Sequence, residues 1–282
     1  MSSKFYEIDC EEAEPVIVEI TTAGERIWHN YDPEIDLAAA ELGFDEPSDC
    51  FVGWTAVADD YLDGELIIRA DAGNLQLVDL LLFLGADPNA TELGPGGHPY
   101  TSAPLTFAAS AGHLAIVKLL LDNGADPSIM QNFALGFAAE GGHQEIVELL
   151  LTCDGVNLDD NKGYALKQAA EEGHAAIVRL LLDAGATVSA GRALDFAITA
   201  ADNREIVDML LAQPGLIDDH DKAMALSASA IYGKTWAIRK LLKAGIPLEA
   251  EKARIEQAIE NAYDEGYPGI AQLIEDHYDY RL

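Results

Sequence analysis

The hydrophobic residues of this chain follow a pattern that returns three times. A Gly-His pair begins each copy, at Gly112-His113, Gly142-His143 and Gly173-His174, with spacings of 30 and 31 residues. In each copy Ile-Val and then three leucines follow the pair within the next eight residues. A fixed period of this length predicts a stack of similar repeats, and it favours binding over catalysis as the function.

Each repeat predicts two helices joined by a short turn. The first is short and rich in small residues, as in 104–112, and the second is longer, as in 114–122. Alanines such as Ala108 and Ala109 let two helices approach closely, and the glycine ends the first helix in the left-handed conformation at low cost. The second helix is apolar on more than one face, as expected for a helix between two neighbours.

These positions resemble the pattern of ankyrin repeats. The pattern is matched in order by Pro104-Leu105, Ala108-Ala109, Gly112-His113, Ile116-Val117, Leu119-Leu120-Leu121 and Gly124-Ala125-Asp126. The resemblance covers residues 64–250 clearly and the remainder more weakly. The Thr-Pro-Leu-His of the family is present only as Ala103-Pro104-Leu105-Thr106, and the other repeats lack it. The resemblance implies a mainly all-α fold, a solenoid of helix-turn-helix repeats with hairpin loops.

Two domains are expected. Residues 64–282 form the array, with about six repeats and a polar C-terminal capping repeat from about Arg254. The fifth repeat carries one extra residue near 200–202, and 263–268 stands as an insertion between the last two helices. Residues 91–102, with two Pro and three Gly, read as a long loop. Residues 1–63 fit no repeat and predict a small α/β cap, with strands at 16–20 and 26–28 and a helix at 33–42.

Charge narrows the class of partner. The chain has 49 acidic and 17 basic residues and a net charge of -32, which excludes electrostatic binding to nucleic acid and disfavours an anionic membrane surface. It favours a basic protein partner, unless the acidity serves only solubility or a salty habitat. The basic residues cluster late in the chain, at Arg192, Arg204, Lys222, Lys234, Arg239, Lys240 and Lys243.

The remaining composition indicates a cytoplasmic protein. Apolar runs such as 78–84 are too short to span a bilayer, and no apolar segment of a signal peptide follows the N-terminus. The three cysteines, Cys10, Cys50 and Cys153, are scattered and odd in number. They therefore argue against a disulfide framework or a zinc site and fit a reducing compartment.

No motif for catalysis, a cofactor or a metal is found. Phosphate-binding, metalloprotease and hydrolase motifs are missing from the sequence. The histidines of the three Gly-His pairs lie one repeat, about 10 Å, apart, which is too far for a shared metal. The resemblance implies that they are structural hydrogen-bonding residues. The acidic run 218–221 lacks the alternating ligands and turn glycine of a calcium loop.

Candidate contacts for a partner lie on the loop tips and the first helices. The tips and their neighbours supply Tyr100, Gln131, Asn132, Asp159, Asp160, Asn161, Tyr164, Asp219 and His220. Solvent-facing places near the end of the first helix hold Glu140, Glu171, Glu172 and Tyr232. The third place of the first helix is expected to pack between repeats, and it holds Ile68, Phe107, Phe137, Gln168, Phe196, Ala228 and Gln257.

Three classes of function follow from these features. The first is a non-enzymatic module that binds a basic protein through its concave groove and hairpin tips, in its sharpest form an inhibitor or immunity protein against a basic toxin or nuclease. The alternative is a nucleic-acid mimic, with residues 1–60, of net charge -14, as the mimic. An enzyme within that segment is disfavoured, because it has no nucleophile-base spacing and is small for a catalytic domain. The oligomeric state is left open.

Overall fold

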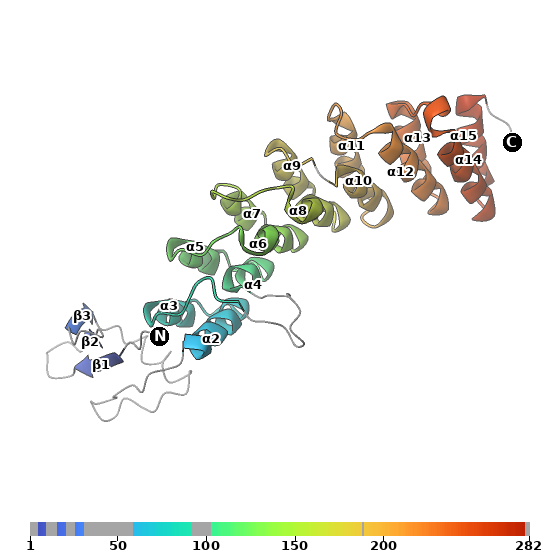
Figure 1. Ribbon diagram of the computed structural model, residues 1–282. Coiled ribbons are helices and arrows are strands. Elements are labelled where there is room, and N and C mark those ends of the chain that lie inside the picture. The colour runs from blue at the N-terminus through green and yellow to red at the C-terminus, as the bar shows by residue number, and fades with distance from the viewer. Residues whose placement is uncertain are drawn as a thin grey trace. The chain divides into compact units, whose positions relative to one another are not determined.

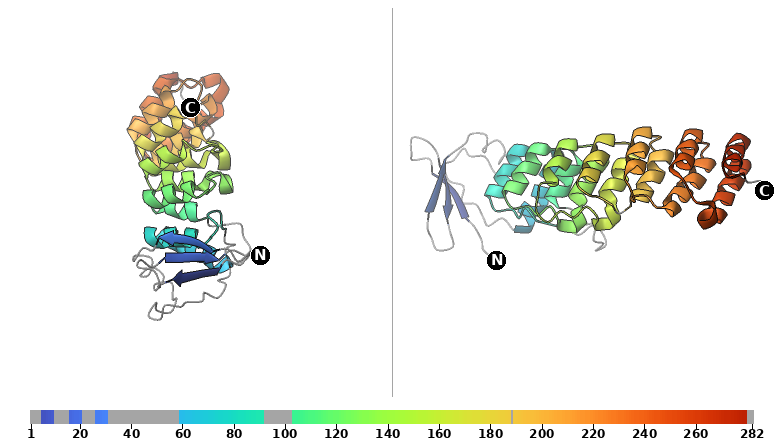
Figure 2. Two further views of the ribbon diagram at one scale, coloured as in Figure 1. Left: turned by 90° about the vertical axis from the view of Figure 1, so that its left-hand side faces the viewer. Right: turned by 90° about the horizontal axis from the view of Figure 1, so that it is seen from above.

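The computed structural model describes residues 5–9, 16–20, 26–30, 59–91, 103–187 and 189–279. These residues belong to two compact units, Met1–Met130 and Gln131–Leu282, and each is described in its own right. Figure 1 gives the helices and strands along the chain, and Figure 2 gives two further views.

The N-terminal unit contains a three-stranded antiparallel sheet. Its strands are β1 (Phe5–Asp9), β2 (Val16–Ile20) and β3 (Arg26–Asn30), in the order β1-β2-β3. Strands β2 and β3 form a hairpin in which Ile20 pairs with Arg26 and Val16 with Asn30. Strand β2 has the bounds of one strand expected from the sequence, β3 includes the other at 26–28 and continues to Asn30, and β1 was not expected. The predicted helix at 33–42 lies outside the described residues, and so does most of the predicted loop at 91–102.

The same unit contains two helix pairs. They are α2 (Asp59–Ala72) with α3 (Leu75–Phe83) and α4 (Pro104–Ser110) with α5 (Leu114–Asp122). Helix α2 packs against both α3 and α4, and α3 packs against α5. Helix α2 begins before residue 64, where the array was expected to start. Leu62 is buried with Leu66 and Ala70, so the apolar stripe of α2 extends one turn further back than the repeat pattern indicates.

The C-terminal unit continues the pairs. In chain order the helices are α6 (Ile129–Glu140), α7 (Gln144–Leu150), α8 (Asp160–Glu171), α9 (Ala175–Asp183), α10 (Ala190–Thr199), α11 (Arg204–Ala212), α12 (Asp219–Ile231), α13 (Thr235–Ala244), α14 (Leu248–Asp264) and α15 (Pro268–Tyr278). The first helices of successive pairs, from α8 to α14, pack side by side, and so do the second helices α7, α9 and α11 (Figure 1). This arrangement is the predicted all-α solenoid.

The core lies between the two layers of helices. Alanines such as Ala138 and Ala139 are fully buried, as are the branched residues of the second helix, for example Val147 and Leu150. Small residues on the first helix let the second approach, and each buried Val or Leu side chain stabilises the fold by about 1.5–3 kcal/mol. The recurring Ile-Val positions and the middle leucine of each three are therefore core positions, whereas the two outer leucines are half-buried.

A glycine with positive φ forms the corner between the two helices of a pair. Gly142 has a φ of 76° and Gly173 a φ of 82°, a backbone region that residues other than glycine rarely adopt. In the fifth repeat the corner has one extra residue, as expected, and Asp202 takes the left-handed conformation with a φ of 49°.

The last helix pair differs from its prediction. Residues 263–268 were expected as an insertion between the helices, but α14 continues through Asp264 and the turn is only 265–267. The buried residues Ile255, Ala258, Ile259 and Ala262 follow helical spacing, so the apolar stripe carries the helix on. After a kink at Glu251, α14 has thirteen residues up to Asp264, as many as α12, and Gly266 forms the usual corner with a φ of 79°, so no residues are inserted.

Candidate partner-binding surface

Three aromatic rings meet on the first helices of the C-terminal unit. Phe133 and Phe137 come from α6 and Tyr164 comes from α8. The ring centroids of the two phenylalanines are 5.7 Å apart, and the centroid of Tyr164 lies 6.1 Å from that of Phe133 and 5.9 Å from that of Phe137, edge-on in both cases. Edge-to-face pairs at these distances are favourable beyond their buried area.

A lysine extends this cluster to the next helix. The Nζ atom of Lys167 in α8 lies 5.6 Å from the ring centroid of Tyr164 and 5.3 Å from that of Phe196 in α10. A cation over an aromatic face is attracted by the ring quadrupole. We call Phe133, Phe137, Tyr164, Lys167 and Phe196 together the aromatic face. All five side chains are half-buried, so they keep surface that a partner can cover.

Gly136 makes room for this packing. A Cβ atom added at Gly136 would lie 2.4 Å from Cδ1 of Tyr164, closer than any real contact of that kind. The position is buried within α6, where glycine costs about 1 kcal/mol of helix propensity relative to alanine. The absence of a side chain there lets the tyrosine ring lie directly against the helix.

Carboxylates border the aromatic face. The hydroxyl of Tyr164 donates a hydrogen bond to Oε2 of Glu140 over 2.9 Å. Burial raises the pKa of Tyr164 well above its usual value, and the hydrogen bond to Glu140 and the charges of Glu140 and Glu171 add to this rise. The phenol therefore stays protonated at neutral pH. Rings bordered by carboxylates form a surface suited to lysine or arginine side chains of a partner.

Two of the predicted contacts are part of the scaffold. Asn132 is 5% exposed, and its Nδ2 atom lies 2.6 Å from Oδ2 of Asp160 and 3.3 Å from the carbonyl oxygen of Asn157. Asn157 in turn donates to Oδ1 of Asp160 over 2.6 Å. These bonds hold the start of α8 against α6. The prediction that Asn132 contacts a partner is therefore wrong, and both oxygens of Asp160 are already engaged within the chain.

The remaining predicted loop residues lie in a helix, accept a hydrogen bond within the chain, or fall outside the residues that the structure describes. Asn161 has a φ of 48° at a kink inside α8, and Asp159 accepts a hydrogen bond from the backbone N–H of Thr187 over 3.3 Å. Gln131 lies in α6 rather than in a loop. The side chain of Gln131 and all of Tyr100 fall outside the described residues.

The predicted contacts near the helix ends vary in exposure. Tyr232 is 58% exposed and Glu172 is exposed, as expected, whereas Glu140 and Glu171 are half-buried. Asp219 is half-buried in the first turn of α12, where its Oδ1 lies 2.9 Å from the ammonium of Lys222. His220 is exposed, with its Nδ1 atom 3.9 Å from Oε2 of Glu251.

The third place of the first helix departs in part from its expected packing. Gln168 is buried, and Phe107, Phe137, Phe196 and Ala228 are half-buried. Ile68 is 54% exposed and Gln257 is exposed, so the expectation of packing between repeats is wrong for these two. Ile68 belongs to α2 of the N-terminal unit. Gln257 lies nine residues before the corner Gly266, whereas Phe107 lies five before Gly112, so Asn261 and not Gln257 occupies this place.

Phe133 and Lys167 were not among the contacts predicted from the sequence. Phe133 precedes Phe137 by four residues, and residues at that spacing share one face of a helix. Tyr164 occupies the same place in the next repeat as Phe133, counted back from the Gly-His pair. This agreement was the signal for an aromatic cluster across two repeats.

Two histidines of the Gly-His pairs have a structural role. Nε2 of His113 lies 3.0 Å from the carbonyl oxygen of Asp71, and Nε2 of His174 lies 3.0 Å from that of Glu140. For these two residues the expected structural hydrogen bond is confirmed. Within the part of the chain that the structure describes, no three His, Cys, Asp or Glu residues gather as metal ligands do.

Stacked helix pairs with glycine corners define a helical repeat protein. A family model described as "Ankyrin repeats (3 copies)" matches residues 66–161 and 105–192. Over these residues the chain contains ankyrin repeats, and such repeats indicate a protein–protein interaction module. No curated protein matches the sequence. None of the described helices is both long and apolar enough to cross a membrane.

Proposed function

We propose that this protein is a non-enzymatic module that holds a basic partner protein on its aromatic face. The observation that carries the proposal is the group of four half-buried rings on α6, α8 and α10. Aromatic residues fill protein cores when they are fully buried and are enriched at binding hot spots when they stay accessible.

The charge of the partner is inferred from the surroundings of the rings. Glu140 and Glu171 lie close enough to Tyr164 to raise its pKa, and the exposed Glu172 follows them. The chain as a whole has a net charge of -32, which attracts a basic protein over long range. Lys167 already occupies the space between two rings in the way that a lysine or arginine of the partner would. An inhibitory role toward that partner remains a prediction.

The test begins with the full chain, tagged and used to capture proteins from its native cell at low and physiological salt. We expect a basic protein to be retained by the wild type and lost with Tyr164→Ala/Phe196→Ala. Leu75→Ala is the matched control, because Leu75 is also a partly exposed apolar residue, on a helix of the other unit. Circular dichroism confirms that each variant is folded.

The sign of the partner charge is tested by Lys167→Met. This change removes a positive charge but keeps an apolar side chain between the rings. A basic partner is expected to bind about threefold to tenfold more tightly, because one like charge is removed. Lys118→Met, at an exposed site on α5, is the control. Weaker binding with Lys167→Met, or equal capture by the double variant and the wild type, overturns the proposal.

A further inference from the structure

Helix α13 carries a basic and aromatic face in an otherwise acidic chain. Trp236, Arg239, Lys240 and Lys243 are spaced by three, one and three residues, which places them on one side of the helix. The segment Thr235–Ala244 contains no acidic residue. We call these four residues, with Arg204 of α11, the α13 basic face. It lies on the second helices, whereas the aromatic face lies on the first helices (Figure 1).

Trp236 is fixed in position at the centre of this face. Its Nε1–H donates to Oδ1 of Asp202 over 2.8 Å. The guanidinium carbon of Arg204 lies 5.1 Å from the indole ring centroid, and Nζ of Lys240 lies 5.8 Å from it. The indole is only half-buried, so a rigid aromatic surface with two cations beside it remains accessible.

The acids around Trp236 are neutralised by partners of their own. Asp202 pairs with Lys234 over 3.2 Å, Asp208 pairs with Lys240, and Glu205 pairs with Arg179 over 2.8 Å. Hydrogen bonding to Trp236 and the nearby cations hold the pKa of Asp202 below its usual value, so it is ionised at neutral pH.

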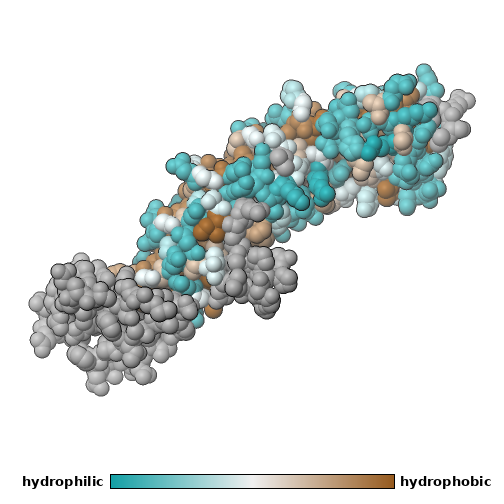
Figure 3. All heavy atoms as spheres, in the orientation of Figure 1, coloured by the Kyte–Doolittle hydropathy of each residue, from teal (hydrophilic) through white to brown (hydrophobic). Residues whose placement is uncertain are grey.

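Two cations of this face are exposed and uncompensated. Arg239 and Lys243 are exposed and have no ion-pair partner among residues 59–91, 103–187 and 189–279. The face ends at α15, where Asp276 accepts a hydrogen bond from Gln272 over 2.8 Å. In Figure 3 hydrophilic residues cover most of the visible surface over these C-terminal helices.

We propose that the α13 basic face binds an acidic segment of a second protein. At physiological salt the Debye length is about 8 Å, so a short segment that contacts this face responds to its local positive charge more than to distant acids. A nucleic acid carries phosphates well beyond the face, and the net charge of -32 repels them. Trp and Arg are also the residue types that dominate protein–protein hot spots. The protein would therefore hold two partners of opposite charge on two faces.

The probe is a fluorescein-labelled peptide that alternates Glu and Asp with Phe, and its binding to the full chain is followed by anisotropy. We expect saturable binding that weakens as salt rises. Arg239→Glu/Lys243→Glu is expected to reduce the affinity by about tenfold or more. Lys118→Glu/Lys252→Glu has the same change in charge on exposed residues elsewhere and is expected to retain most of the affinity.

Each other outcome contradicts the proposal. No saturable binding, or an equal loss in the two double variants, shows that the face has no specific role. Tighter binding of a single-stranded oligonucleotide than of the peptide, lost with Arg239→Glu/Lys243→Glu, shows that the occupant is a nucleic acid. Tyr164→Ala/Phe196→Ala is expected to leave peptide binding unchanged, so this result is separate from that for the aromatic face.

Discussion

The imidazole of His174 contacts the corner of the preceding repeat at Glu140. Its Nε2 atom lies 3.0 Å from the carbonyl oxygen of Glu140, and a Cβ atom added at Gly142 would lie 2.7 Å from Cε1 of the same ring. Glycine is therefore required at this corner for two reasons. It adopts the left-handed conformation, and it leaves room for the imidazole of the next repeat. Gly73 and His113 show the same relationship in the N-terminal unit.

This relationship predicts unequal effects of two glycine substitutions. Gly142→Ala combines a φ of 76° with a clash against His174, whereas Gly185→Ala combines a φ of 98° with open space. We expect Gly185→Ala to lower the free energy of unfolding by about 1 kcal/mol and Gly142→Ala by about 2–4 kcal/mol. Urea unfolding measures both. Equal losses would show that the backbone conformation alone requires glycine.

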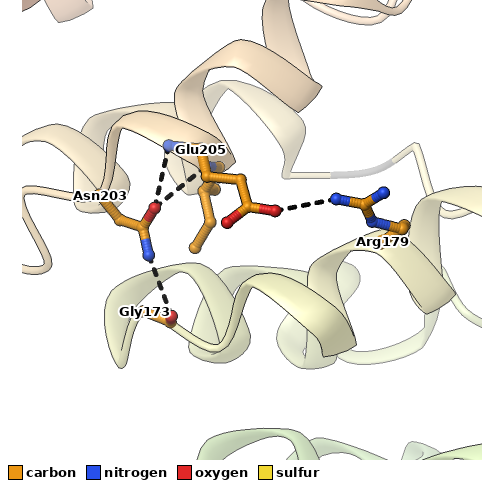
Figure 4. Close-up of polar contacts among 5 residues, drawn as sticks. Gly173, Arg179, Asn203 and Glu205 are labelled. Atoms are coloured by element: carbon orange, nitrogen blue, oxygen red, sulfur yellow. Dashed lines mark hydrogen bonds and ion pairs between the residues drawn. The ribbon is translucent and has the colours of Figure 1, made fainter.

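Asn203 replaces the histidine in the fifth repeat and has two roles (Figure 4). Its Nδ2 donates to the carbonyl of Gly173 over 3.1 Å, and its Oδ1 accepts from the backbone N–H groups of Glu205 and Ile206 at the start of α11. Asn203→Ala removes both and is expected to cost about 2 kcal/mol. Asn203→Asp keeps the helix cap and loses the donor, with an expected cost of about 1 kcal/mol. A cost for Asn203→Asp equal to that of Asn203→Ala would contradict this division.

Asp195 predicts an unusual dependence of stability on pH. Burial raises the pKa of Asp195 to about 6, the charge of Asp221 adds to the rise, and Arg192 opposes it. The folded state therefore holds this proton more tightly than the unfolded chain, so the contribution of Asp195 to stability falls as pH rises from about 4 to about 6. Above that range the charged form destabilises the fold.

Asp195→Asn is expected to increase the free energy of unfolding above about pH 7 by about 1–2 kcal/mol, after allowance for solvent screening. Urea unfolding at several pH values measures this and shows whether the fall between about pH 4 and 6 becomes shallower. Asp202→Asn is the contrasting variant, because the pKa of Asp202 is lowered and its charge is paired. A gain for Asp202→Asn, or a loss for Asp195→Asn above pH 7, would contradict this account.

The repeated parts of the fold are predictable because each position recurs. The period sets the register, so the sequence alone assigns Ile146 and Val147 to the core and Gly142 to the corner. The prediction is wrong for the last helix pair. Residues 263–268 were interpreted as an insertion, but α14 ends at Asp264, two residues before the corner Gly266, just as α12 ends at Ile231, two residues before Gly233.

The site is harder to predict, because it depends on contacts between repeats. The polarity of Asn132 indicates a loop residue, yet its amide is buried against Asp160 of the next helix. Tyr164 and Phe137 stand out in the sequence for different reasons, and nothing in one repeat alone shows that their rings meet. Lys167 gives no signal of its own, because a lysine on a helix is ordinarily solvated, and here it lies between two rings.

We expect the partner to bind on the aromatic face. The most direct measurement is the dissociation constant of the purified basic partner, obtained by isothermal titration calorimetry against the wild type, Tyr164→Ala/Phe196→Ala and Leu75→Ala. We predict a loss of at least about 2 kcal/mol, about thirtyfold in the dissociation constant, for the double variant and little change for Leu75→Ala. An unchanged dissociation constant for a folded double variant would show that the partner binds elsewhere.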